Sequence, residues 1–158
     1  MDYIEYKLLN SLQKNARLTN LELAKQVGLS ASPCLRRVKS LEESGVIEGY
    51  SAIINQNKVN LSVNVFVQVS LERQSEDRLH VFEEKVMEYK EVMEAYLMTG
   101  DADYLLRIVV KDLQAYEKLL KDNLTKIQGI SSIRSYFSLK QVTRKYNLPI
   151  INPKLSHE

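Results

Sequence analysis

Basic and hydroxyl side chains cluster in the stretch SASPCLRRVKSLEESG, from Ser30 to Gly45. Guanidinium, ammonium and hydroxyl groups are the side-chain donors that bind DNA phosphates and base edges. On a helical wheel most of this cluster lies opposite an apolar stripe, with Arg37 at the flank. The alternative is a basic face that contacts only solvent. The candidate DNA contacts are Ser30, Ser32, Arg36, Arg37, Lys39 and Ser40.

The single cysteine, Cys34, falls in the apolar stripe of this stretch together with Leu35. We therefore expect it to act as a small buried hydrophobic residue. A redox-active thiol is the alternative, because arginines follow closely and such thiols sit in electropositive surroundings. The two histidines, His80 and His157, are far from each other and from Cys34, so no metal-ligand spacing is present.

The segment TGDADY, from Thr99 to Tyr104, offers two carboxylates and a hydroxyl beside backbone amides. These groups suit the ammonium and carboxylate of an amino acid, although glycine and aspartate are also usual in a plain β-turn. A metal-dependent enzyme using Asp101 and Asp103 is a further alternative. Two aspartates on one turn are a poor ligand set, so we expect neither catalysis nor a metal site.

Three helices are predicted between Asp2 and Gly45, and the third contains the basic cluster. Asp2 with Glu5, and Thr19 with Glu22, have the spacing of capping boxes. Gly28 can end the second helix in a left-handed conformation, and Pro33 is tolerated in the first turn of the third. Two helices joined by a tight glycine turn after a supporting helix form a helix-turn-helix, here about residues 20–39. The segment VIEGYSAII should then form short wing strands.

The second half of the chain alternates strands and helices. Apolar residues occupy every second position from Val63 to Leu71, whereas Leu79, Phe82 and Val86 recur at helical spacing. The strands VMEAYLMT and YLLRIVV, a helix capped by Asp112 that continues to Ile127, and a strand ISSIRSYFSLKQV complete a β-α-β-β-α-β order. This order predicts a ferredoxin-like α+β domain. Its open sheet face would carry Phe66, Tyr96, and Tyr136 or Phe137, and we expect a second copy of the chain to cover it.

Composition limits the class of protein. The 158 residues have a net charge of +2, and residues 1–60 already contain this excess with eight basic and six acidic side chains. DNA binding would therefore depend on local placement of charge. No apolar run approaches the roughly 20 residues that cross a bilayer. One cysteine and no apolar leader predict a cytoplasmic protein that does not bind membranes.

The chain resembles the Lrp/AsnC feast/famine family of transcription regulators over roughly Asp2 to Ile150. The motifs that carry the resemblance are LQKNARLTNLELAKQVGLS, SPCLRRVKSLEESGVIEGYSA, MTGDADYLLRIVV and SYFSLKQV. The SPCLRRVK form is closest to the leucine-responsive branch. The resemblance implies a winged helix-turn-helix over residues 1–62, a ferredoxin-like effector and oligomerisation domain over 63–150, and a tail over 151–158.

The resemblance also implies how such a chain works. Family members dimerise through their sheets, assemble into octamers or hexadecamers, and bind amino acids in clefts between dimers. Ala102 departs from the bulkier, often aromatic residue of relatives. By motif position the effector residues are Leu97, Thr99, Gly100, Asp101, Asp103 and Leu113, with Thr125 and Tyr136 from the neighbouring dimer.

These observations together predict a sequence-specific DNA-binding regulator that needs no cofactor and is tuned by an amino acid. Leu97 and Leu113 favour a leucine-like or methionine-like effector. Two-fold dimers would bind an imperfectly palindromic operator. The alternative is an amino-acid-sensing interaction protein that does not itself bind DNA.

Overall fold

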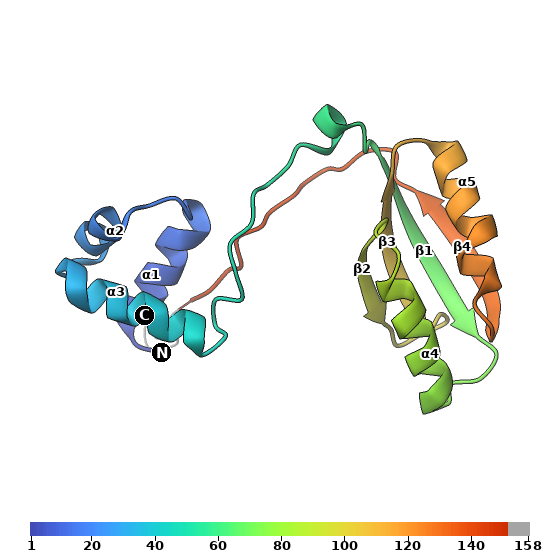
Figure 1. Ribbon diagram of the computed structural model, residues 1–158, viewed down its shortest axis with the longest axis horizontal. Coiled ribbons are helices and arrows are strands. Elements are labelled where there is room, and N and C mark those ends of the chain that lie inside the picture. Colours follow the sequence, from blue (N-terminus) through green and yellow to red (C-terminus); the bar gives the residue numbers. More distant parts are fainter. Residues whose placement is uncertain (152–158) are drawn as a thin grey trace. The chain divides into compact units, whose positions relative to one another are not determined.

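The computed structural model describes residues 1–151, which form two compact units (Figure 1). The helical unit comprises Met1–Ile53 and the chain from Val142 onward, whereas the sheet unit comprises Ile54–Gln141. Residues 54–62 were expected in the first domain and residues 142–150 in the second, so both segments group differently from the expectation. His157, and the expected tail apart from Ile151, lie outside the described residues.

The helical unit contains α1 (Tyr3–Lys14), α2 (Asn20–Val27) and α3 (Ala31–Glu43). Both predicted capping boxes are confirmed. The Asp2 side chain accepts the Glu5 N–H at 2.9 Å, and the Glu5 side chain accepts the Asp2 N–H at 2.7 Å. Thr19 and Glu22 exchange the corresponding bonds at the start of α2. These bonds satisfy amides that lack a partner inside the helix, and so they define where each helix begins.

The core of the helical unit is small and apolar. Cys34 is fully buried and Leu41 is nearly so, which places one side of α3 against α1 and α2. Leu35 does not join this core and is 45% exposed, so its predicted place in the apolar stripe is wrong. Cys34, Val38 and Leu41 follow one helical stripe, and Leu35 is rotated by about 100° from Cys34. The buried residues of this core are Leu8, Leu9, Leu23, Ala24, Val27, Cys34 and Leu41.

The predicted wing strands are wrong, because residues 46–55 contain no strand. An extended segment becomes a strand only when a neighbouring segment accepts its backbone hydrogen bonds. Within the described residues no backbone hydrogen bond joins residues 48–54 to another segment. Tyr50 donates instead to the Glu42 side chain at 2.8 Å, and Val46 and Ile53 remain exposed.

The chain returns to the helical unit after leaving the sheet. The Leu148 N–H donates to Gln13 Oε1 at 2.6 Å, and Gln13 Nε2 donates to the Leu148 carbonyl at 3.3 Å. Ile150 packs against the helical core. The N-terminal domain is therefore completed by residues from the other end of the described chain.

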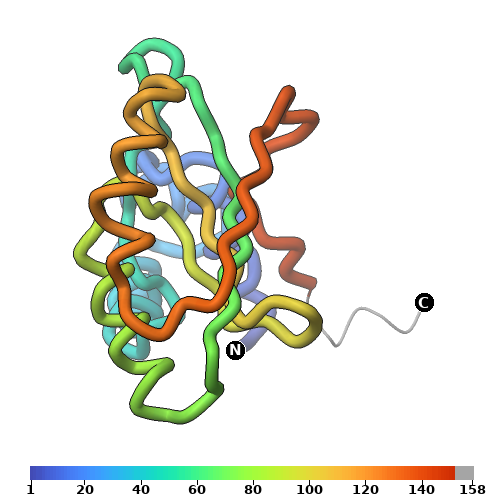
Figure 2. The backbone as a smooth tube through the Cα atoms, turned by 90° about the vertical axis from the view of Figure 1, so that its right-hand side faces the viewer, coloured from blue at the N-terminus to red at the C-terminus, as the bar shows by residue number. Residues whose placement is uncertain are grey.

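The sheet unit has the predicted β-α-β-β-α-β order. After a short 3-10 turn, η1 (Gln56–Val59), its elements are β1 (Val63–Leu71), α4 (Glu76–Met87), β2 (Val92–Leu97), β3 (Tyr104–Val110), α5 (Leu113–Asp122), the 3-10 turn η2 (Leu124–Lys126) and β4 (Ile130–Phe137). The strands are antiparallel in the order β2-β3-β1-β4. Figure 2 shows α4 and α5 together on one face of the sheet.

The two faces of the sheet differ in burial. Val65, Val67 and Val69 of β1 are fully buried under the helices, as the alternation predicts. The last helix is shorter than predicted, because Asn123 breaks it before η2. The last strand ends at Phe137 rather than Val142, and beyond it the Ser138 N–H still donates to the Asn64 carbonyl at 3.0 Å, close to the start of β1 at Val63.

Candidate DNA-recognition helix and effector loop

The third helix presents a polar face to solvent. Burial of Cys34 and Leu41 fixes its rotation, and the side chains of Ser32, Arg36 and Lys39 are exposed as predicted. Ser40 is exposed beside them, and the Ser30 hydroxyl at the N-cap makes no capping hydrogen bond. No acidic residue lies in the first turn of α3. The N-terminal half of α3 thus offers hydroxyl and guanidinium donors to a partner.

Arg37 differs from the other candidate DNA contacts. Its Nη1 pairs with Asp2 Oδ2 and lies 3.6 Å from Glu5 Oε1, so the guanidinium points towards the start of α1. The pKa of Asp2 is lowered, first by the Glu5 N–H that it accepts and then by Arg37. These ion pairs join α3 to the start of α1, and a DNA contact by Arg37 stays a prediction.

The turn between α2 and α3 is held by specific bonds. Gly28 has a φ of 76°, which favours glycine. The Leu29 N–H donates to the Ala24 carbonyl at 2.9 Å, and the Asn20 side-chain amide donates to the Ala31 carbonyl at 2.8 Å. Asn20 was not singled out in the sequence. Its position at the first residue of α2 gave no signal, because its partner belongs to the next helix.

The thiol of Cys34 lies within the helical core. Burial raises the pKa of Cys34, which disfavours the thiolate that a reactive cysteine requires. The basic neighbour Arg36 extends outwards, and Arg37 is paired with carboxylates. This environment supports a structural role for the cysteine.

The loop between β2 and β3, together with the last residue of β2, contains five of the eight predicted effector residues. Leu97, Thr99, Gly100 and Asp101 are exposed, and Gly100 has a φ of 128°. Ser70 Oγ lies 3.5 Å from the Asp101 carbonyl, at the limit of a hydrogen bond. Asp103 differs from the others because it is 7% exposed and bonded within the chain. The exposed part of the loop leaves a carboxylate, a hydroxyl and backbone amides accessible.

The predicted effector residues divide between the two ends of the sheet. Leu97 pairs with Tyr104 and Leu71 pairs with Ile130, so the β2–β3 loop, Thr125 and the start of β4 share one end. Leu113 and Tyr136 lie at the other end, where β3 and β4 finish. β3 has seven residues, so the two ends are about 20 Å apart. One chain does not bring all eight residues together.

The sheet face away from the helices is aromatic. Phe66, Tyr96 and Tyr136 are 38%, 51% and 50% exposed and share this face by strand register. Phe137 instead lies on the helix side, where its ring meets Tyr116 edge-on at 5.3 Å. The Arg107 Nε donates to Glu94 Oε1 at 2.7 Å on the open face, a pair that the sequence did not predict.

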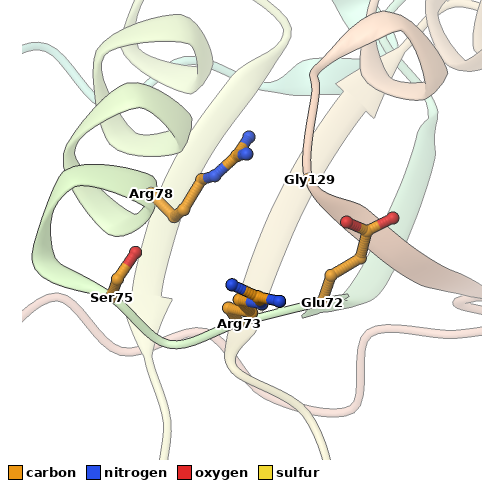
Figure 3. Close-up of a pocket in the computed structure, with 5 residues that line it drawn as sticks. All are labelled: Glu72, Arg73, Ser75, Arg78 and Gly129. Atoms are coloured by element: carbon orange, nitrogen blue, oxygen red, sulfur yellow. The ribbon is translucent and has the colours of Figure 1, made fainter.

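A shallow hollow of about 450 Å³ lies beside the β1–α4 connection. Figure 3 shows the Arg78 side chain reaching from α4 towards the chain at Gly129, with Glu72, Arg73 and Ser75 around it. All four of these side chains are exposed.

Within residues 1–151 no group of three or more histidine, cysteine, aspartate or glutamate side chains could hold a metal ion. Asp101 and Asp103 do not converge, because Asp103 is engaged by Leu71 and Gln74.

Comparison with known proteins agrees with this architecture. Residues 1–48 match the family model for a winged helix-turn-helix DNA-binding domain, and residues 64–148 match that for the Lrp/AsnC ligand binding domain. The Bkd operon transcriptional regulator of Pseudomonas aeruginosa is 45% identical, over 95% of this chain and 98% of its own length. The leucine-responsive regulatory protein of Escherichia coli is 41% identical, over 95% of this chain and 92% of its own length.

Solved structures show the same fold. A transcriptional regulator of Neisseria meningitidis in complex with L-methionine superposes with a TM-score of 0.89 at 38% identity, covering 94% of this chain and 96% of the other. An AsnC family regulator of Agrobacterium tumefaciens also gives 0.89, at 42% identity with 94% and 97% coverage. No helix within residues 1–151 is long and apolar enough to span a bilayer. With a helix-turn-helix followed by the matching ligand-binding domain, this chain belongs to the Lrp/AsnC family of transcriptional regulators.

Proposed function

We propose that this chain is a sequence-specific DNA-binding regulator whose assembly or DNA affinity changes when a small amino acid binds. The observation that carries the proposal is the orientation of α3. Its apolar side is buried on α1 and α2, whereas Ser32, Arg36 and Lys39 face outwards. The second helix of a helix-turn-helix enters the major groove with its N-terminal residues towards the bases. Arg36 is our leading base or phosphate contact, supported by Ser30, Ser32, Lys39 and Ser40.

A homodimer is the proposed binding unit. Phe66, Tyr96 and Tyr136 form an exposed aromatic surface on the open sheet face, and a second copy of the chain would cover it. Arg107 and Glu94 pair on the same face and would be shielded from water there. A two-fold dimer carries two α3 helices. We therefore expect an imperfectly palindromic operator with half-sites about one helical turn apart.

The β2–β3 loop is the proposed effector contact. Asp101 would receive the ammonium of the amino acid, and the exposed amides near Gly100 and the Thr99 hydroxyl would receive its carboxylate. Leu97 and Leu113 are 60% and 61% exposed, which suits an apolar effector side chain. The relatives named for leucine response and the neighbour solved with L-methionine support an effector of this kind.

A complete effector cleft would need more than one dimer. Leu113 and Tyr136 lie about 20 Å from the loop along β3, so another chain would have to supply them beside it. Binding at such a junction would couple the amino acid to assembly, because a ligand stabilises whichever state binds it more tightly. An octamer or larger assembly in the cytoplasm is the form that we propose for the regulator.

Mobility-shift titration over a salt series tests the DNA half of this proposal. We expect the logarithm of the association constant to fall linearly with that of the salt concentration, by about 0.9 per phosphate contact. A specific duplex should also bind at least about 10³ times more tightly than random duplex DNA. Retardation of no duplex at low salt would favour an amino-acid-sensing interaction protein instead.

Thermal unfolding in the presence of each standard amino acid tests the effector half. A ligand that binds only the folded protein raises its unfolding temperature. At a ligand concentration of a hundred times Kd, the free energy of unfolding increases by about 2.7 kcal/mol. We expect the largest increase with L-leucine or L-methionine. An equal response to all amino acids, or none, would contradict the effector proposal without affecting the DNA proposal.

A further inference from the structure

Asp103 is the one charged side chain that is buried among the described residues. It is 7% exposed and lies directly before β3, at the foot of the β2–β3 loop. A buried carboxylate needs partners, because an ion that leaves water without them is strongly destabilised. For residues 1–151 no buried side-chain nitrogen or oxygen lacks a hydrogen bond. The partners of Asp103 therefore indicate what the residue does.

Both oxygens of the Asp103 carboxylate accept hydrogen bonds from the β1 side of the sheet unit. Oδ2 accepts the N–H of Leu71 at 2.6 Å, and Oδ1 accepts the side-chain amide of Gln74. Leu71 is the last residue of β1, and Gln74 lies in the connection to α4. The carboxylate thus joins the end of β1 and the β1–α4 connection to the loop.

The backbone of Asp103 makes two further bonds at the same place. Its N–H donates to the Val69 carbonyl at 3.0 Å, and its carbonyl accepts the Met98 N–H at 2.7 Å. The bond to Met98 closes the loop at its base, and the bond to Val69 holds that base against β1. The backbone conformation at the two ends of residues 99–102 therefore depends on the bonds of Asp103.

We infer that Asp103 is a positioning residue for the effector loop, in place of the direct effector contact expected by motif position. This inference rests on the proposed effector function of the loop. Each oxygen already accepts a donor from the chain, and little of the side chain remains exposed to an incoming amino acid. Asp101, which is exposed, remains the carboxylate available to the ligand.

Three variants of the full-length protein distinguish positioning from contact. Asp103→Ala removes both side-chain bonds, whereas Asp103→Asn can keep them, because Gln74 can turn its amide oxygen towards the new side-chain N–H group. Gln74→Ala removes one bond and leaves the carboxylate charge in place. Glu72→Gln is the matched control, since Glu72 is exposed and lies next to Leu71 in the chain, whereas the donors to the Asp103 carboxylate are Leu71 and Gln74.

Two measurements are made on each variant. Calorimetric titration with L-leucine and L-methionine gives Kd, and hydrogen exchange of the Met98 and Asp103 amides gives the order of the loop base. We expect Asp103→Ala to raise Kd and exchange rate by about tenfold or more, and Gln74→Ala to raise both by a smaller factor. Asp103→Asn should stay within about threefold of the unsubstituted protein in both, as should the control.

The opposite pattern would overturn the inference. If Asp103 contacts the amino acid through its charge, Asp103→Asn will weaken binding as much as Asp103→Ala while exchange remains unchanged. Unchanged exchange in both Asp103→Ala and Gln74→Ala would also refute positioning. If the unsubstituted protein binds no amino acid, the proposed effector function fails, and exchange alone decides whether Asp103 orders the loop.

Discussion

Replacing Arg36 by alanine tests whether this arginine contacts DNA, and the adjacent Arg37 serves as its comparison. Arg36 is exposed on α3, whereas Arg37 pairs with Asp2 and Glu5 and keeps 33% of its side chain exposed. The two side chains have the same charge and adjacent positions. The two alanine variants therefore differ mainly in whether the lost guanidinium faced solvent, as in Arg36, or the carboxylates at the start of α1, as in Arg37.

The expected loss on Arg36→Ala follows from the two copies of this residue in the proposed dimer. An arginine that binds a base contributes about 1–3 kcal/mol, so two copies give at least about 2 kcal/mol, or roughly a 30-fold increase in Kd. If Arg36 binds phosphate instead, two lost contacts reduce the salt slope by about 1.8. Raising the salt concentration from about 50 to about 200 mM would then weaken DNA binding by the variant by a factor about ten times smaller than for the unsubstituted protein.

The matched variant Arg37→Ala should behave differently. Its ion pairs are partly exposed, and such pairs contribute about 0–1 kcal/mol to stability. We expect a small decrease in unfolding free energy and an increase in Kd below about fivefold, because the lost charge acts only at long range.

Mobility-shift titration measures both variants on a duplex selected by the unsubstituted protein from a random library. Unchanged affinity and salt slope for Arg36→Ala would refute its assignment as a DNA contact. An equal or larger loss for Arg37→Ala would refute the orientation of α3 on which that assignment depends.

Three further outcomes are expected. Ile150→Asp should lower the urea-unfolding free energy of the helical unit by about 1–2 kcal/mol, since Ile150 packs on its core, whereas the same change at exposed Ile151 should leave it unchanged. Cys34 should react with a disulfide reagent at least about 100-fold faster in denaturant than in the native protein, and a fast native reaction would contradict its burial. The lowered pKa of Asp2 adds stability that is present above its ordinary value of 3.8 and is lost as pH falls through the lowered pKa, so Asp2→Asn should show a shallower acid decrease in unfolding temperature. Parallel acid profiles for the two proteins would contradict this reasoning.

Local signals in the sequence predicted most of the fold. The capping boxes at Asp2 and Thr19 and the turn at Gly28 involve residues within a few positions of one another, and all three are present. The alternation in β1 and the cap at Asp112 also depend on neighbouring residues. The ferredoxin-like order followed because each element could be recognised separately.

The errors have a common physical origin in partners that are distant along the chain. Wing strands were expected from the β-branched and aromatic residues after Val46, but a strand also requires backbone hydrogen bonds to another segment, and residues 48–54 make none within the described chain. Leu35 was assigned to the core by angular position alone, although Cys34, Val38 and Leu41 already fill that side of α3. The return of Leu148 to Gln13 spans most of the chain and left no pattern in the sequence.

The basic cluster on α3 shows what each level of description determined. The sequence by itself established a helix with arginines, serines and one buried cysteine, because helical spacing and turn residues are local properties. Helical spacing placed Arg36 opposite the apolar stripe and Arg37 at the flank, but it identified no partner for either guanidinium. Only the packing of α1 against α3 decided that Arg37 pairs with Asp2 and leaves Arg36 free to face outwards. The orientation of a long side chain depends on the charges brought near it by folding, and these belong to another helix.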